Sequence, residues 1–203
     1  MPKAPYLAPV PDYGHWIVTF KSVTDASPGT ASPADGTAAA TSAPPVPPAP
    51  DASPKTIETI KTGNLRGVTV TLNNGTSSQF TCKGDWILCS TPTGPALGIA
   101  SPLSHPYTYY TTGYILLDGV TINMSTFKET ALHNGALAFH YKSGDVNVWI
   151  DPVSMLPLTV KNLDVEASYR FLTPPSEPLP IPKDQAALLQ KEEAAYKAVS
   201  SMR

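Results

Sequence analysis

The sequence predicts a mainly β protein made of antiparallel strands, with one helix at its C-terminus. Its clearest stretch contains Val146, Val148 and Ile150, which alternate with polar or aromatic residues. Such alternation is typical of a strand that buries one face. An Asp-Pro turn follows, and the apolar run 156–163 returns as a partner strand. A third strand runs into the paired prolines 174–175, where a strand ladder cannot continue.

Further strands are expected earlier in the chain, each marked by alternation or by a flanking turn. They cover residues 13–20, 55–62, 68–72, 86–88, 113–117, 120–127 and 136–141. The sequence Asn73-Asn74-Gly75 predicts a hairpin with Gly75 in the left-handed conformation. This turn places Val68 opposite Phe80, so both side chains lie on one face of the sheet.

The length of 203 residues is consistent with one domain. We divide the chain into an N-terminal segment with the first strand, a linker or arm, an antiparallel β domain and a helix, at residues 1–22, 23–54, 55–182 and 183–203. Ala, Ser, Thr and Pro dominate the second part, which has too little apolar area to fold alone. It is either a semi-rigid polyproline spacer or an arm that docks on another subunit.

The C-terminal helix is predicted to start near Pro182 and Asp184, and Asp184 can cap its free backbone N–H groups. Apolar residues then recur at helical spacing, but in a narrow stripe. Such a helix lies on a sheet edge, frays into solvent, or docks into the groove of a partner.

Charge and hydropathy exclude two classes of partner. Charged residues make up 15% of the chain, and 14 basic against 16 acidic side chains give a net charge of −2. This balance provides no basic surface for nucleic acid. No run approaches the ~18 apolar residues of a membrane span, so no transmembrane segment is expected. No signal peptide is visible at the N-terminus either.

The two cysteines, Cys82 and Cys89, flank a predicted turn at 83–85. Their spacing fits neither a redox motif nor paired zinc ligands. An even count of two cysteines in a chain typical of exported proteins favours a disulfide across this hairpin, which requires the two Cα atoms to face each other within about 7 Å. Two buried free thiols are the alternative.

No catalytic or metal site is expected from the sequence, and no cofactor. The four histidines form no metal-binding pair, and neither a nucleophile elbow nor a phosphate-binding glycine loop is present. The aspartates stand beside Gly, Pro or strand ends, where turn formation explains them.

Aromatic residues are the best candidates for recognising a ligand. A tyrosine has an apolar body and a polar tip, which suits contacts with ligands or subunits. The candidate ligand-binding residues are Tyr107, Tyr109, Tyr110, Tyr114 and Trp149. The alternation of tyrosines in this cluster is also what a half-buried strand shows.

The sequence WIDPVSMLPL at 149–158, followed by YRFLTPP at 169–175, resembles the outer-membrane lipoprotein carrier superfamily. The periplasmic sensor that regulates envelope-stress sigma factors belongs to the same superfamily. The resemblance covers the last third of the chain and implies a curved antiparallel half-barrel whose concave face binds acyl chains. The family usually begins with an amphipathic helix, whereas residues 13–20 here are typical of a strand.

Two functions follow as expectations for an exported protein, periplasmic or extracellular, whose signal peptide is absent from this form. The first is a non-enzymatic cell-envelope binding module for an acyl chain or another apolar ligand. The second is a structural subunit whose proline-rich arm and C-terminal helix contact neighbouring copies. A hydrolase is the least favoured function, because the sequence shows no nucleophile paired with a base.

Overall fold

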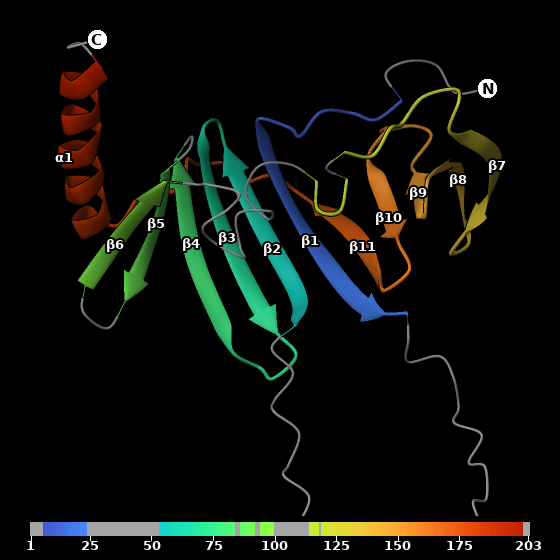
Figure 1. Ribbon diagram of the computed structural model, residues 1–203, viewed down its shortest axis with the longest axis horizontal. Coiled ribbons are helices and arrows are strands. Elements are labelled where there is room, and N and C mark those ends of the chain that lie inside the picture. The colour runs from blue at the N-terminus through green and yellow to red at the C-terminus, as the bar shows by residue number, and fades with distance from the viewer. Residues whose placement is uncertain are drawn as a thin grey trace, which may run out of the picture.

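The computed structural model describes residues 6–23, 53–83, 86–91, 94–99, 114–117 and 119–200. These residues form one sheet of eleven strands and one helix (Figure 1). The elements are β1 (Tyr13–Ser22), β2 (Pro54–Thr62), β3 (Leu65–Leu72), β4 (Ser77–Lys83), β5 (Trp86–Thr91), β6 (Gly94–Ile99), β7 (Phe127–His133), β8 (Ala136–Ser143), β9 (Val146–Ile150), β10 (Pro157–Lys161), β11 (Val165–Leu172) and α1 (Lys183–Ser200). The predicted fold class, a mainly β protein with a curved antiparallel sheet and a C-terminal helix, is confirmed.

The first and last strands of the sheet lie side by side in its middle. The strand order is β6-β5-β4-β3-β2-β1-β11-β10-β9-β8-β7, and all neighbours are antiparallel. Trp16 and Val18 of β1 pair with Phe171 and Tyr169 of β11. This pairing joins two meanders into one open sheet, with β6 and β7 as its edge strands.

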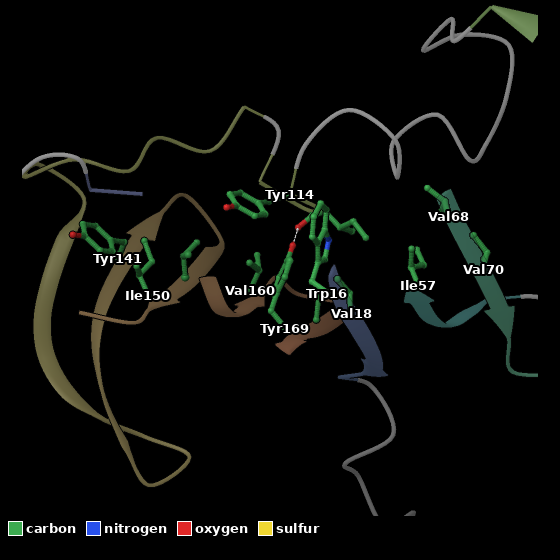
Figure 2. Packing of buried hydrophobic residues seen from close by; sticks show 13 residues of the cluster. Trp16, Val18, Ile57, Val68, Val70, Tyr114, Tyr141, Ile150, Val160 and Tyr169 are labelled. Atoms are coloured by element: carbon green, nitrogen blue, oxygen red, sulfur yellow. Dashed lines mark hydrogen bonds between the residues drawn. The ribbon is translucent and has the colours of Figure 1, made fainter. Parts of the chain in front are cut away.

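One face of the sheet, which we call the core face, carries the main hydrophobic cluster. Because side chains alternate between faces along a strand, every second residue of the central strands joins it. Figure 2 shows these side chains spread in a row along the sheet, from Val68 and Val70 at one end to Tyr141 at the other. The fully buried members include Trp16, Val18, Ile57, Val68, Val70, Tyr141, Val148, Ile150 and Val160.

The opposite face, which we call the back face, meets the helix at one end of the sheet. Helix α1 contacts β5 and β6 (Figure 1) and buries Leu189. Leu88, on the back face of β5, is fully buried. An ion pair of 3.0 Å between Lys83 Nζ and Glu193 Oε1 links the helix to β4. Part of the helix surface is therefore occupied by contacts with strands of the same chain.

The hairpin between β3 and β4 confirms the predicted turn and register. Gly75 has a φ of 85°, the left-handed conformation that glycine adopts without strain. Val68 pairs with Phe80, so the core-facing residues of both strands share one face.

Two predicted strands are wrong, and two real strands were missed. Residues 114–117 and 119–126 are turns and irregular chain. Leu116 (φ 64°), inside the first predicted strand, and Gly119 (φ 73°), just before the second, take left-handed conformations outside the β region. Strand β7 escaped prediction because its sequence, FKETALH, lacks regular alternation. Strand β6 escaped it because GPALGI contains glycine and proline.

The predicted disulfide between Cys82 and Cys89 is not formed, and Cys82 is a buried free thiol. The register explains the difference, because Ile87 lies opposite Cys82 while Phe80 lies opposite Cys89. The two cysteines are therefore diagonal neighbours, whose Cα atoms are typically about 7–8 Å apart. That separation exceeds the distance that a disulfide usually bridges.

Candidate functional site

Four aromatic rings meet at the centre of the core face. Tyr114 packs edge-on against Tyr169 and Phe171, with ring centroids 6.2 and 6.4 Å apart. Phe171 also lies 6.3 Å from Trp16, its register partner on β1. Strands β1 and β11 fix three of these rings, and Tyr114 reaches them from outside the sheet (Figure 2).

Tyr114 belongs to a stretch that crosses the core face and that we call the covering segment, residues 114–117 and 119–122. Leu116, Leu117, Val120 and Ile122 of this segment pack against the core cluster. It contains neither helix nor strand, and Figure 1 shows it passing over the middle of the sheet towards β7. The apolar core is therefore covered by irregular chain.

Two tyrosine hydroxyls hold the covering segment in place. The hydroxyl of Tyr169, on the sheet, donates a hydrogen bond to the carbonyl oxygen of Ile115 (Figure 2). The hydroxyl of Tyr114 donates to the carbonyl oxygen of Pro9 at 3.1 Å. Burial raises the pKa of Tyr114 to about 12, so both hydroxyls stay protonated donors at neutral pH; the pKa of Tyr169 is also raised by burial.

Three buried polar groups of the core face have no hydrogen-bond partner among the described residues. They are Oγ1 of Thr59, Nη1 of Arg66 and the hydroxyl of Tyr141. The exposed fractions of these residues are 1%, 8% and 0%. A buried polar group without a partner loses its hydration with no compensation. Such groups make the core face a candidate for binding ordered water or the polar group of a ligand.

Arg66 is the most unusual of the three because it is charged. Burial lowers its pKa, which reports the lost hydration of the guanidinium. Its register partner on β4 is Cys82, whose pKa burial raises to about 11, so this thiol is neutral. Its partner on β2 is Lys61, another cation, which is bound to Asp12 Oδ1 at 3.1 Å.

The back face carries a different aromatic cluster, centred on Trp149. The imidazole rings of His133 and His140 stack on its indole, with centroids 4.3 and 4.9 Å away. His133 Nε2 also bonds the hydroxyl of Thr159 at 2.9 Å, and His140 Nε2 bonds Asn147 Oδ1 at 3.1 Å. Both imidazoles of this cluster therefore have a hydrogen-bond partner.

The structure separates two of the predicted ligand-binding residues. Tyr114 lies over the core face. Trp149 lies on the back face, because it alternates along β9 with Val148 and Ile150, which are buried on the core face. One small ligand cannot contact both. Three other candidates, Tyr107, Tyr109 and Tyr110, lie outside the described residues.

Sequence reasoning missed Arg66 and Thr59 as functional candidates, although one signal was present. Arg66 stands in phase with Val68 and Val70 in the alternating sequence LRGVTVTL. A charged residue at an inward-facing position of a strand is exceptional. The phase of the alternation alone could have identified it.

The described residues contain no group of three or more His, Cys, Asp or Glu side chains that could hold a metal ion. In the same part of the chain, no helix is long and apolar enough to cross a membrane. Comparison with known proteins finds no family model and no curated protein that matches this chain.

Proposed function

We propose that the protein is a non-enzymatic binding module of the cell envelope that holds an acyl chain or another apolar ligand against the core face. The observation that carries this proposal is the covering segment. It buries the aromatic centre of the sheet, yet it has no helix or strand of its own. Segments with few regular hydrogen bonds open at lower free energy than strands or helices.

The covering segment is held to the sheet mainly by apolar packing and by few hydrogen bonds, so it can move away as a unit. Its hydrogen bonds to the sheet and to the N-terminal segment, among the described residues, are those from Tyr169 to Ile115, from Tyr114 to Pro9 and from the backbone N–H of Thr121 to Ser143 on β8. Leu116 adds strain, because its φ of 64° is unfavourable for a residue with a side chain. Opening relieves this strain and exposes Trp16, Tyr169 and Phe171 as a surface for an apolar ligand.

The protonation states of the titratable groups on the core face favour ligand binding over catalysis. The pKa of Tyr114 is raised to about 12 and that of Cys82 to about 11, in both cases mainly by burial. Neither group is ionised at neutral pH, so neither can act as a base or a nucleophile there. The guanidinium of Arg66 donates hydrogen bonds but accepts no proton.

Fluorescence titration with the neutral apolar dye N-phenyl-1-naphthylamine tests the proposal. We expect saturable binding to the native chain and a several-fold lower apparent Kd for Tyr169→Phe. This variant lacks the hydroxyl that ties the covering segment to the sheet, so a larger fraction of molecules is open and competent to bind. Tyr13→Phe is the matched control. Tyr13 is 60% exposed, so removing its hydroxyl should leave the Kd unchanged.

Two results would contradict the proposal. The first is the absence of saturable dye binding to both the native chain and Tyr169→Phe. The second is an equal Kd for these two proteins, which would show that the covering segment does not control access.

A second candidate function, a structural subunit, is favoured by two exposed leucines at one edge of the sheet. Leu132 on the edge strand β7 pairs with Leu137 on β8, and they are 76% and 53% exposed. Adjacent exposed leucines beside an edge strand favour pairing with another chain. In this proposal the proline-rich arm at 23–54 and helix α1 add further contacts between copies.

Light scattering coupled to size exclusion separates the two candidates. A structural subunit forms oligomers at micromolar concentration, and Leu132→Ser shifts them to monomers. Leu163→Ser is the control, because Leu163 is also 67% exposed but lies at the turn between β10 and β11. A native chain that stays monomeric over the whole concentration range would exclude this candidate.

A further inference from the structure

The strongest unexplained feature of the molecule is the buried positive charge of Arg66. Its side chain is 8% exposed, and its Nη1 atom bonds no described residue. Proteins rarely bury an arginine without a paired anion, because an unpaired buried ion loses its hydration without compensation.

No nearby acidic group of the described chain neutralises Arg66. Asp12 is bound to Lys61, whose Nζ atom also donates to the carbonyl oxygen of Pro11 at 2.9 Å. Cys82, opposite Arg66 on β4, remains a neutral thiol. Among the described residues, these two cations and one anion therefore leave a net positive charge at this end of the core face.

Thr59 adds a second unpaired group beside Arg66. It is 1% exposed, and its hydroxyl has no partner among the described residues. Thr59 pairs with Val68, and Lys61 pairs with Arg66. Thr59 thus lies diagonally across from Arg66 on the same face, at the usual spacing of about 7–8 Å between Cα atoms.

The two groups offer donors that suit one ligand chemistry. A guanidinium presents a planar fork of N–H groups that matches the two oxygens of a carboxylate. A threonine hydroxyl can donate one more hydrogen bond to the same oxygens. An acidic head group would therefore satisfy both unpaired groups at once.

Thr59 also connects this end of the face to the aromatic centre. Its register partner on β1 is Trp16, which in turn pairs with Phe171 on β11. From β3 to β11 is three strand spacings, or about 14 Å. A ligand held by its head group at Arg66 would extend its apolar tail past Trp16 and under the covering segment.

We propose that Arg66 and Thr59 form the head-group site for an amphiphilic monocarboxylate, such as a fatty acid, whose tail lies on the core face. This inference rests on the proposed function, because it assigns a ligand class to the same apolar site. It adds a specific prediction, which is selectivity for a carboxylate over a neutral head group on the same tail.

Competition with the bound dye measures this selectivity with two probes, dodecanoate and 1-dodecanol. We expect the native chain to bind dodecanoate roughly tenfold more tightly or better, the effect of one or more charge-assisted hydrogen bonds. Arg66→Met should remove the difference by weakening dodecanoate alone. Arg66→Lys keeps the charge without the fork and should retain part of it. Arg170→Met is the control, because Arg170 is exposed on the back face.

The outcomes are distinguishable. Equal affinities of the two probes for the native chain, or an undiminished preference in Arg66→Met, would overturn the head-group site while leaving an apolar binding module intact. Failure of both probes to bind would overturn the proposed function and the head-group site together. If Arg66→Met does not fold, as judged by circular dichroism, Arg66→Lys and Thr59→Val carry the test. In that case an unchanged probe ratio in both variants overturns the head-group site.

Discussion

Two buried threonine hydroxyls, one on each face of the sheet, differ in whether they are hydrogen-bonded. On the back face, Thr159 is 1% exposed, and its hydroxyl is bonded to His133. On the core face, Thr59 is equally buried, but its hydroxyl has no partner in the described chain. The same residue type at the same burial is thus satisfied on one face and unsatisfied on the other.

This difference indicates that hydrogen bonding contributes more fully to the stability of the back face than to that of the core face. Both imidazoles that stack on Trp149 have hydrogen-bond partners, Thr159 on β10 for His133 and Asn147 on β9 for His140. The core face keeps Thr59, Arg66 and Tyr141 unpaired. Unsatisfied groups persist in natural proteins chiefly where function requires them. The core face is therefore the better candidate for a binding surface.

The largest expected effect comes from two isoleucines of β2 that face opposite ways. Ile57 is fully buried in the core face, whereas Ile60 lies half-buried on the back face. Ile57→Ala should lower the free energy of unfolding by about 2–5 kcal/mol, because it removes buried methyl groups and leaves a cavity. Ile60→Ala should lower it by less than half as much. Urea unfolding measures both, and equal losses would mean that the two faces are equally packed.

The two arginines of the described chain give the next largest contrast. Arg66→Met should raise the free energy of unfolding of the ligand-free protein by about 1–3 kcal/mol, because it replaces an unpaired buried charge with an apolar side chain. Arg170→Met, on the exposed side of β11, should change it by no more than about 0.5 kcal/mol. A clear loss of stability in Arg66→Met would show that the guanidinium has a favourable partner in the folded chain.

The sequence predicted the strands whose alternation is uninterrupted and missed those that depend on tertiary contacts. In β3, the alternation of Val68 and Val70 with threonines gave both the strand and its pairing with Phe80. The apolar residues around Leu116 look like another strand. They instead cover the core, and a left-handed φ at Leu116 ends any extended run. Local pattern cannot distinguish a strand that forms the sheet from a segment that packs over it.

The candidate site was less predictable for a related reason. Tyr114 was recognised as aromatic, but its partner Tyr169 lies 55 positions away and meets it only through the fold. The cluster of His133, His140 and Trp149 needs β7, a strand that the sequence did not reveal. Arg66 could have been found from its phase in β3. That it has no counter-ion among the described residues is visible only in three dimensions.

Substitutions of Thr59 and Thr159 test the same comparison, with a smaller expected change in the free energy of unfolding. Thr59→Val removes an unpaired hydroxyl and keeps the shape of the side chain, so it should stabilise the protein by about 1 kcal/mol. Thr159→Val removes a paired hydroxyl and leaves His133 Nε2 without that partner, so it should destabilise by a similar amount. Thermal unfolding of both variants measures the signs. The same sign in both would end the distinction between the two faces.

The smallest expected effect is a pH dependence that belongs to the back face alone. Burial lowers the pKa of His133, an effect that Glu166 opposes and His140 reinforces. The folded protein therefore favours the neutral imidazole, while the unfolded chain takes up a proton once the pH falls below about 6.5. Stability should decrease as the pH falls through that value and recover as it rises, because the unfolded state binds more protons there. Thermal unfolding of the native chain and of His133→Gln between neutral and mildly acidic pH isolates this contribution as the difference between their slopes. Parallel curves of stability against pH for the two proteins would show that His133 has the same pKa in the folded and unfolded states. Burial beside Trp149 would then not lower that pKa.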